Sequence, residues 1–262
     1  MTDNQTNLAS DTTAPVGSEA NPLVISTREA APDAADAAVT SLGNSVTTYE
    51  VAFRTSADLS SDLPADLRDL VSKAASAVTG TVATAQHAQV EAARARADKT
   101  MYPEGRELLA KASLDGARKK VDQALDQADT LMTVADASLY EAARPRLATE
   151  DAMPARADLN MLTQRHMGSG SLADVLKGIA QRTDAVGALV ADPTYLRDFL
   201  SANGVEEKLS EAIQIIVRAE VTKTAAASAD AQRAAAGKTS LALTELRKAR
   251  AAAAAYTRHK LG

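Results

Sequence analysis

"PADLRDLVSKAASAVTGTVATAQHAQVEAA" (residues 64–93) holds the clearest periodicity in this chain of 262 residues. Its small and apolar side chains recur at alternating steps of three and four residues. That spacing places them on one face of an α-helix, as in the seam of a coiled coil. The residues on this stripe are Leu67, Val71, Ala74, Val78, Thr81, Ala85, Ala88 and Ala92. The stretch predicts a long helix that packs along one narrow face.

A second stripe of the same kind follows a short break at "DKTMYPEG" (residues 98–105). Pro103 suits the first turn of a new helix, and Arg144 ends it because a residue before a proline avoids the helical region. The members of the second stripe are Leu114, Ala117, Val121, Ala124, Ala128, Leu131, Ala135, Ser138 and Ala142. The two stripes predict an antiparallel helical hairpin over residues 64–145. Each arm is roughly 50–60 Å long at a rise of ~1.5 Å per residue.

The composition favours helices over the whole chain. Hydrophobic residues make up 45% of the sequence, and alanine is by far the commonest of them, while aromatic residues make up only 3%. Alanine is the strongest helix former, and its small side chain lets helices approach closely. We therefore predict an all-α fold: an elongated helical bundle with the long hairpin, a small helical head and a long C-terminal helix.

The segments before the hairpin are less regular. Residues 1–26 are polar and acidic, and they are predicted to form a flexible tail. Residues 27–63 are predicted to be weakly helical or irregular, because Gly43 and Asn44 interrupt the helical pattern. The stretch "TTYEVAF" within them has strand propensity, but the chain offers no strand of similar quality to pair with it.

The segments after the hairpin differ in texture. Residues 146–204 are denser in large aliphatic side chains. Within them Leu172, Val175, Leu176 and Ile179 mark an amphipathic helix, so a compact head of short helices is predicted. Residues 205–262 are predicted to form one long helix with a basic C-terminal end. Gly237 is its one weak point, where we expect the helix to bend or split.

Motifs that carry chemistry are incomplete in this sequence. "QRAAAGKT" (residues 232–239) ends like a phosphate-binding loop, but it lacks the first glycine and a preceding strand. We therefore interpret it as a helix with one glycine. His87, His166 and His259 do not have metal-ligand spacing, and the absence of cysteine excludes disulfides and thiolate sites. The sequence predicts no enzyme, no cofactor and no metal, although catalytic residues far apart in sequence would leave no such motif.

Charge is distributed unevenly in a chain whose net charge is −5. Residues 1–36 carry six acidic side chains against one arginine, and residues 238–262 carry six lysines and arginines against one glutamate. Cations at the end of a helix favour its dipole, which accounts only for the last of them. We interpret the C-terminal helix as a docking element that is separate from the body. Its candidate partner-binding residues are Arg247, Lys248, Arg250, Tyr256, Arg258 and Lys260.

The layout of the chain resembles scaffolding and minor structural proteins of tailed phages. The features that carry the resemblance are the tail at residues 1–26, the helical body and the ending "LRKARAAAAAYTRHKLG" (residues 246–262). The resemblance implies a virion component present in many copies, with contacts to capsid, portal or neck proteins and no cofactor.

These features predict a non-enzymatic structural protein that assembles through helix–helix contacts, with copies of itself and other subunits as partners. One alternative is a phasin-like amphipathic coat protein, although the stripes are narrow for adsorption to lipid. Another is a nucleic-acid-associated protein that uses its basic end. The start of the chain lacks the basic and apolar regions of a signal peptide. We therefore expect a cytoplasmic or virion location and no membrane partner.

Overall fold

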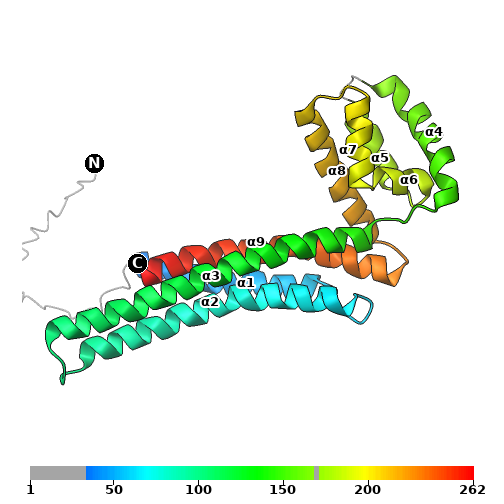
Figure 1. Ribbon diagram of the computed structural model, residues 1–262. Helices are drawn as coiled ribbons and strands as arrows, with labels where there is room; N and C mark the ends of the chain where they lie inside the picture. Colours follow the sequence, from blue (N-terminus) through cyan, green and yellow to red (C-terminus); the bar gives the residue numbers. More distant parts are fainter. Residues whose placement is uncertain (1–33, 168–170) are drawn as a thin grey trace, which may run out of the picture. The chain divides into compact units, whose positions relative to one another are not determined.

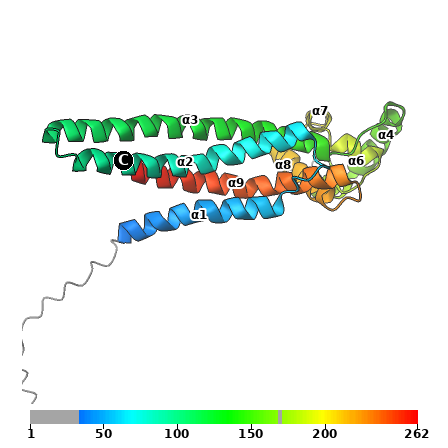
Figure 2. The same ribbon diagram turned by 90° about the horizontal axis from the view of Figure 1, so that it is seen from below.

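Three long helices pack side by side in the computed structural model, which describes residues 34–167 and 171–262. They are α2 (Ala65–Ala97), α3 (Pro103–Ala143) and α9 (Ala231–Leu261), and α1 (Ala34–Ser56) packs beside them from Val39 onward (Figures 1 and 2). We call these four helices the bundle. Residues 39–262 form one compact unit. The flexible tail predicted for residues 1–26 lies outside the described residues.

The antiparallel hairpin of α2 and α3 is the most extensive helix pair of the described chain. All eight residues of the first predicted stripe are buried. Ala117, Val121, Ala128 and Ala135 of the second stripe are also buried. The rest of the second stripe was placed slightly off. Leu125, Met132 and Leu139 are buried in place of Ala124, Leu131 and Ser138. The buried face of α3 is turned because α3 packs against α9 as well as α2.

Helix α1 lies in the segment that we predicted to be weakly helical or irregular, and the structure there is helical. It runs without a break through Gly43 and Asn44, and Val39, Val46 and Phe53 bury one side of it in the bundle core. A Cβ atom on Gly43 would lie 3.2 Å from Cε2 of Tyr256. Gly43 is therefore a point of close helix contact and not a helix break.

In the described residues, the head contains five α-helices around a core of its own. They are α4 (Ala152–Thr163), α5 (Leu172–Ala180), α6 (Ala185–Val190), α7 (Pro193–Ala202) and α8 (Glu207–Ala226). The side chains of Leu159, Leu176, Leu200 and Ile213 are fully buried in this core. The compact head that we predicted for residues 146–204 thus extends through α8.

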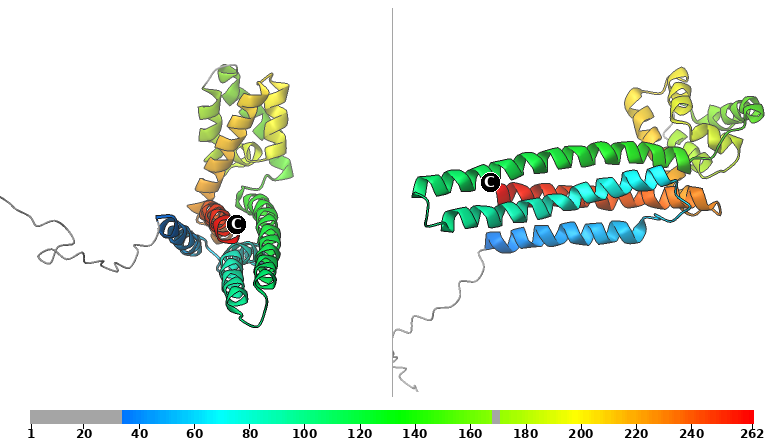
Figure 3. Two further views of the ribbon diagram at one scale, coloured as in Figure 1. Left: turned by 90° about the vertical axis from the view of Figure 1, so that its left-hand side faces the viewer. Right: turned by 60° about the horizontal axis from the view of Figure 1, so that its bottom comes forward.

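The single C-terminal helix that we predicted is two helices. Helix α8 ends at Ala226, and α9 begins at Ala231, where Asp230 accepts a hydrogen bond from the N–H of Arg233 as the N-cap. The chain reverses there, so α9 runs back along the bundle (Figures 1 and 3). The predicted break at Gly237 is wrong, because Gly237 lies inside α9 and is buried.

Helix α9 ends before the tip of the hairpin. The side-chain amide of Gln89 donates to the carbonyl of Lys260, and Nη2 of Arg118 donates to the carbonyl of Leu261 at 2.8 Å. Of the helices that the structure describes, α2 and α3 continue beyond this point, around the small residues Ala92, Ala95 and Ala110. None of the helices described is long and apolar enough to cross a membrane.

Candidate functional site

The end of α3 joins the head through a buried tyrosine. The hydroxyl of Tyr140 donates to the carbonyl of Ala191 at 2.8 Å. Burial raises the pKa of Tyr140 to about 12, against the opposing effect of the cations Arg218 and Arg144. The guanidinium of Arg218, on α8, lies 4.8 Å from the centre of the Tyr140 ring. Tyr140 therefore ties α3 to two elements of the head at once.

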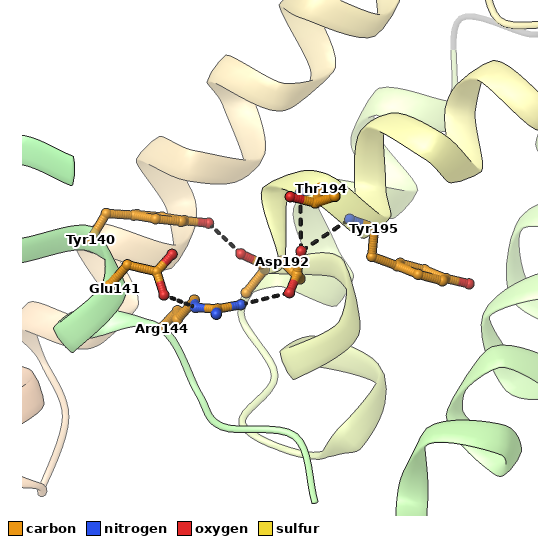
Figure 4. A network of polar contacts seen from close by, with 7 residues as sticks. Tyr140, Glu141, Arg144, Asp192, Thr194 and Tyr195 are labelled. Carbon is orange, nitrogen blue, oxygen red and sulfur yellow. Dashed lines mark hydrogen bonds and ion pairs between the residues drawn. The ribbon is translucent and has the colours of Figure 1, made fainter. Parts of the chain in front are cut away.

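Arg144 closes the same junction one turn later (Figure 4). Its guanidinium binds Glu141 at 2.7 Å and Asp192 at 2.9 Å. Asp192 also caps α7, because its other oxygen accepts from the N–H groups of Thr194 and Tyr195 at 3.0 Å. Burial alone would raise the pKa of Asp192, but these N–H groups and Arg144 outweigh burial and lower it. Asp192 is thus held as a carboxylate that links the two helix ends.

Asp136, one turn before Tyr140 on α3, links three helices at the junction. Its carboxylate binds Arg218 of α8 at 3.2 Å and Arg247 of α9 at 3.0 Å. The carbonyl of Asp136 also accepts from Arg218 at 3.1 Å. Together with Tyr140 and Arg144, Asp136 fixes the head to the end of the bundle.

A cleft of about 1090 Å³ opens at this junction. Its wall includes three arginines and three carboxylates, which are Arg144, Arg146, Arg233, Glu141, Asp192 and Asp230. Arg144 is already paired, and Nε of Arg233 donates to the carbonyl of Ala143 at 3.0 Å. Three of the six charged groups, Arg144, Glu141 and Asp192, bind one another, so these three serve to hold the junction together.

Most of the predicted partner-binding residues are engaged within the chain. Arg250 binds Asp129 at 2.6 Å, and Arg247 binds Asp136. Lys248 binds Glu245 at 2.7 Å and lies 5.8 Å from the ring centre of Tyr49. Arg247 and Arg250 thus bind α9 to α3, whereas Lys248 forms an ion pair within α9 and contacts a tyrosine of α1.

The other predicted residues differ from one another. Tyr256 is only 5% exposed and belongs to the bundle core. Arg258 is exposed, and Lys260 is half-buried. Our interpretation of α9 as a docking element apart from the body is therefore wrong, because its leucines and alanines pack into the bundle core. Partner binding by Arg258 and Lys260 stays a prediction.

The Gly-Lys-Thr of α9 has a structural role. Lys238 binds Asp58 at 3.2 Å. The hydroxyl of Thr239 donates to the carbonyl of Asp58 at 3.1 Å and accepts from its N–H at 3.2 Å. These contacts hold the loop between α1 and α2. The residues 232–239 lie within helix α9, as we predicted, and do not form a phosphate-binding loop. In residues 34–167 and 171–262, no group of three or more His, Asp or Glu side chains is placed to hold a metal ion.

The sequence did not reveal an exposed apolar surface on α8. One side of this helix is buried through Ile213, Val217 and Val221. The opposite side, which we call the α8 outer face, is exposed and consists of Leu209, Ala212, Ile215, Ile216 and Ala219. Ile215 is 69% exposed, Leu209 42% and Ile216 37%. The signal was present in "LSEAIQIIVRAEV" (residues 209–221), where apolar residues are too frequent for one helix face.

Comparison with known proteins gives no relative for this arrangement. No protein-family model, curated protein or solved structure matches the chain.

Proposed function

We propose that the chain is a non-enzymatic structural protein of a large assembly and acts through helix–helix contacts. The observation that carries this proposal is the α8 outer face. An amphipathic helix on the surface of a soluble domain buries one apolar stripe and presents a polar face to water. Helix α8 presents a second apolar stripe, and exposed apolar patches of this kind mark interaction sites.

The way the head is attached supports a role in construction. Tyr140, Arg144 and Asp136 each bind the head from a different position on the end of α3. A subunit that positions its neighbours needs such a fixed geometry, because a loosely hinged head would present the α8 outer face at variable angles.

Helix α4 adds a second exposed surface on the head. Met153 is 71% exposed and Met161 is 67% exposed, two turns apart on the same helix. Methionine side chains are flexible and adapt to varied partners. A head with apolar side chains on two helices supports contacts with more than one neighbour.

The tailed-phage virion is the assembly that the layout of the sequence favours, with copies of the chain and capsid, portal or neck proteins as partners. The two alternatives have less support. A nucleic-acid-binding role of the basic end would depend on Arg258 and Lys260, because Arg247, Lys248 and Arg250 are bound to carboxylates. A coat protein of the phasin type would have to open the bundle, whose seams face inward.

Sedimentation of a native extract tests the proposal, with the chain detected by an antibody and with nuclease treatment as a parallel sample. We expect the chain to migrate in particles much heavier than one copy, and we expect these particles to survive nuclease. Migration as a free monomer would overturn the proposal. Loss of the heavy particles after nuclease treatment would favour the nucleic-acid alternative instead.

A further inference from the structure

Helix α1 is attached to the bundle along one narrow stripe. The side chains of the stripe follow one another at steps of three and four residues and pack into the bundle core, and they are Val39, Leu42, Val46, Tyr49 and Phe53. This is the pattern by which one helix packs against another in a coiled coil. The surface that α1 covers includes Lys248 and Tyr256 of α9. We call it the α1-binding surface.

The rest of the bundle does not depend on α1. Helices α2, α3 and α9 pack against one another in all three pairs, and α1 approaches none of them as closely along its length. Helix α1 lies at the edge of the bundle, on the side of α9 that faces away from α3 (Figures 2 and 3). Release of α1 would therefore expose the α1-binding surface and leave the interfaces among the other three helices in place.

Helix α1 is weak as an isolated helix. More than half of its 23 residues are Thr, Ser, Gly, Asn or Val, which favour a helix less than alanine does. The hydroxyls of Ser45, Thr48 and Thr55 donate to the carbonyls four residues earlier at 2.8, 2.9 and 2.8 Å. Hydrogen bonds of this kind slightly destabilise and bend a helix. The helical structure of α1 therefore depends on its contact with the α1-binding surface.

The loop between α1 and α2 offers a place where the chain can open. Asp58 belongs with α1, because its side chain and its backbone both bind the Gly-Lys-Thr of α9. Leu63 belongs with α2, because it is only 1% exposed in the bundle core. Residues 60–62 between them are exposed. A change of direction at residues 60–62 uncovers no buried side chain of the loop.

We infer that α1 is an exchangeable helix. It leaves the α1-binding surface together with Asp58 while α2, α3 and α9 stay folded, and the surface then binds α1 of a second copy of the chain. The fit identifies the occupant, because α1 of another copy offers the same stripe and the same Asp58. Exchange of an identical element restores every contact and is a low-cost route to association. The inference rests on the proposed function, since it names one helix–helix contact between copies.

Thiol labelling tests whether α1 opens by itself. The chain contains no cysteine, so a single introduced thiol reports on one position. Val46→Cys lies in α1 and Val78→Cys lies in α2, and the two valines are 2% and 0% exposed in the same core. A thiol reagent added to the native full-length chain should modify the Val46→Cys variant at least about tenfold faster, because position 78 is reached only when the bundle unfolds. The stability of both variants is measured by urea unfolding, and the rates are compared after correction for it.

A labelled peptide of residues 34–58 tests whether the α1-binding surface accepts a second α1. Fluorescence anisotropy follows its binding to the full-length chain. The chain's own α1 competes at an effective concentration on the order of mM, so half-saturation should lie in that range. Phe53→Ala in the chain weakens the competing helix and should lower the half-saturating concentration at least about tenfold. Phe53→Ala in the peptide should raise it by a similar factor, and these opposite signs distinguish exchange from adsorption to the surface.

Exposed positions on α1 provide variants that leave the core intact. Thr47→Ala with Thr48→Ala strengthens the chain's own helix, because both threonines are exposed and alanine is the better helix former. This double substitution should slow the labelling of Val46→Cys and weaken peptide binding, each roughly tenfold. Val51→Ser is the matched control: Val51 is 55% exposed on the outer side of α1, and its replacement should change neither measurement.

Two results would overturn the inference. Equal labelling of Val46→Cys and Val78→Cys would show that α1 opens only with the whole bundle. Peptide binding that Phe53→Ala in the chain does not improve, or no binding at about 1 mM of that variant, would show that the surface accepts no second helix. Both results leave the sedimentation test of the proposed function unaffected, because other surfaces of the chain can still hold it in a particle.

Discussion

Replacing Gly237 with alanine should change the stability of the protein in the direction opposite to that expected for a glycine inside a helix. Alanine in place of glycine inside a helix normally stabilises it by about 1 kcal/mol. A Cβ atom on Gly237, however, would lie 2.4 Å from the backbone nitrogen of Ala226 and 2.9 Å from the carbonyl carbon of Ala225. These are backbone atoms at the end of α8, and they cannot rotate away. We expect Gly237→Ala to destabilise the protein.

The size of the expected loss of stability follows from how close the new Cβ atom would lie to the backbone of α8. Ordinary contacts of a Cβ atom begin near 3.4 Å, so the end of α8 would have to move by about 1 Å. Overpacking of this kind costs typically 1–3 kcal/mol, and rigid backbone neighbours place Gly237 at the upper end. After the helix-propensity gain of about 1 kcal/mol, the net loss is about 2 kcal/mol. That loss corresponds to a fall in Tm of roughly 4–8 °C for a domain of this size.

Gly116→Ala is the matched control, and thermal unfolding followed by circular dichroism is the assay. Gly116 lies exposed inside α3, and a Cβ atom there would meet nothing within 4 Å. Its substitution should raise the Tm by roughly 2–4 °C through helix propensity alone. If Gly237→Ala raised the Tm like Gly116→Ala, the close approach of α8 and α9 would be refuted.

Three further results are expected. Val121→Asp buries a charge at a position that is 2% exposed, and it should lower the free energy of unfolding by several kcal/mol in urea titrations, whereas an unchanged midpoint would show that the seam is open. Deletion of residues 238–262 removes core side chains such as Leu243 and Leu246, so the truncated chain should lose cooperative thermal unfolding; a sharp transition at the original Tm would contradict this. Tyr140 has a pKa of about 12 when folded and about 10 when unfolded, so its contribution is complete below pH 10. Roughly 3 kcal/mol of stability should disappear between pH 10 and 12 in the wild type, and Tyr140→Phe should lack that part of the loss.

The hairpin could be predicted from the sequence because its information is local. The residues of the first stripe follow one another at steps of three or four along one helix, and all eight are buried. The second stripe was only partly correct, because the residues of α3 pack against two neighbouring helices, α2 and α9. Met132 and Leu139 belong to the bundle core, in which α3 packs against both α2 and α9. No pattern within α3 alone shows where a helix 100 residues later will lie.

The break between α8 and α9 was missed for a different reason. The residues on both sides are alanines, which favour a helix throughout. Its signal was "SAD" (residues 228–230), where Asp230 supplies the cap of α9 and Ser228 accepts a hydrogen bond toward that turn, from the N–H of Asp230, at 3.1 Å. We placed the break at Gly237 instead, but a glycine is needed there because α9 lies close to the backbone of α8, and not because the helix bends.

The α8 outer face was missed because the sequence analysis followed the charged residues at the C-terminus and overlooked the additional apolar residues of α8. Six cations near the C-terminus suggested a docking element, but the acceptors of four of them lie in the same chain. A cation's partner in the fold, such as Asp129 for Arg250, cannot be found without the fold. The second apolar stripe of α8 needed no fold to be seen, because Ile215 and Ile216 are adjacent and cannot both face the stripe of Ile213 and Val217.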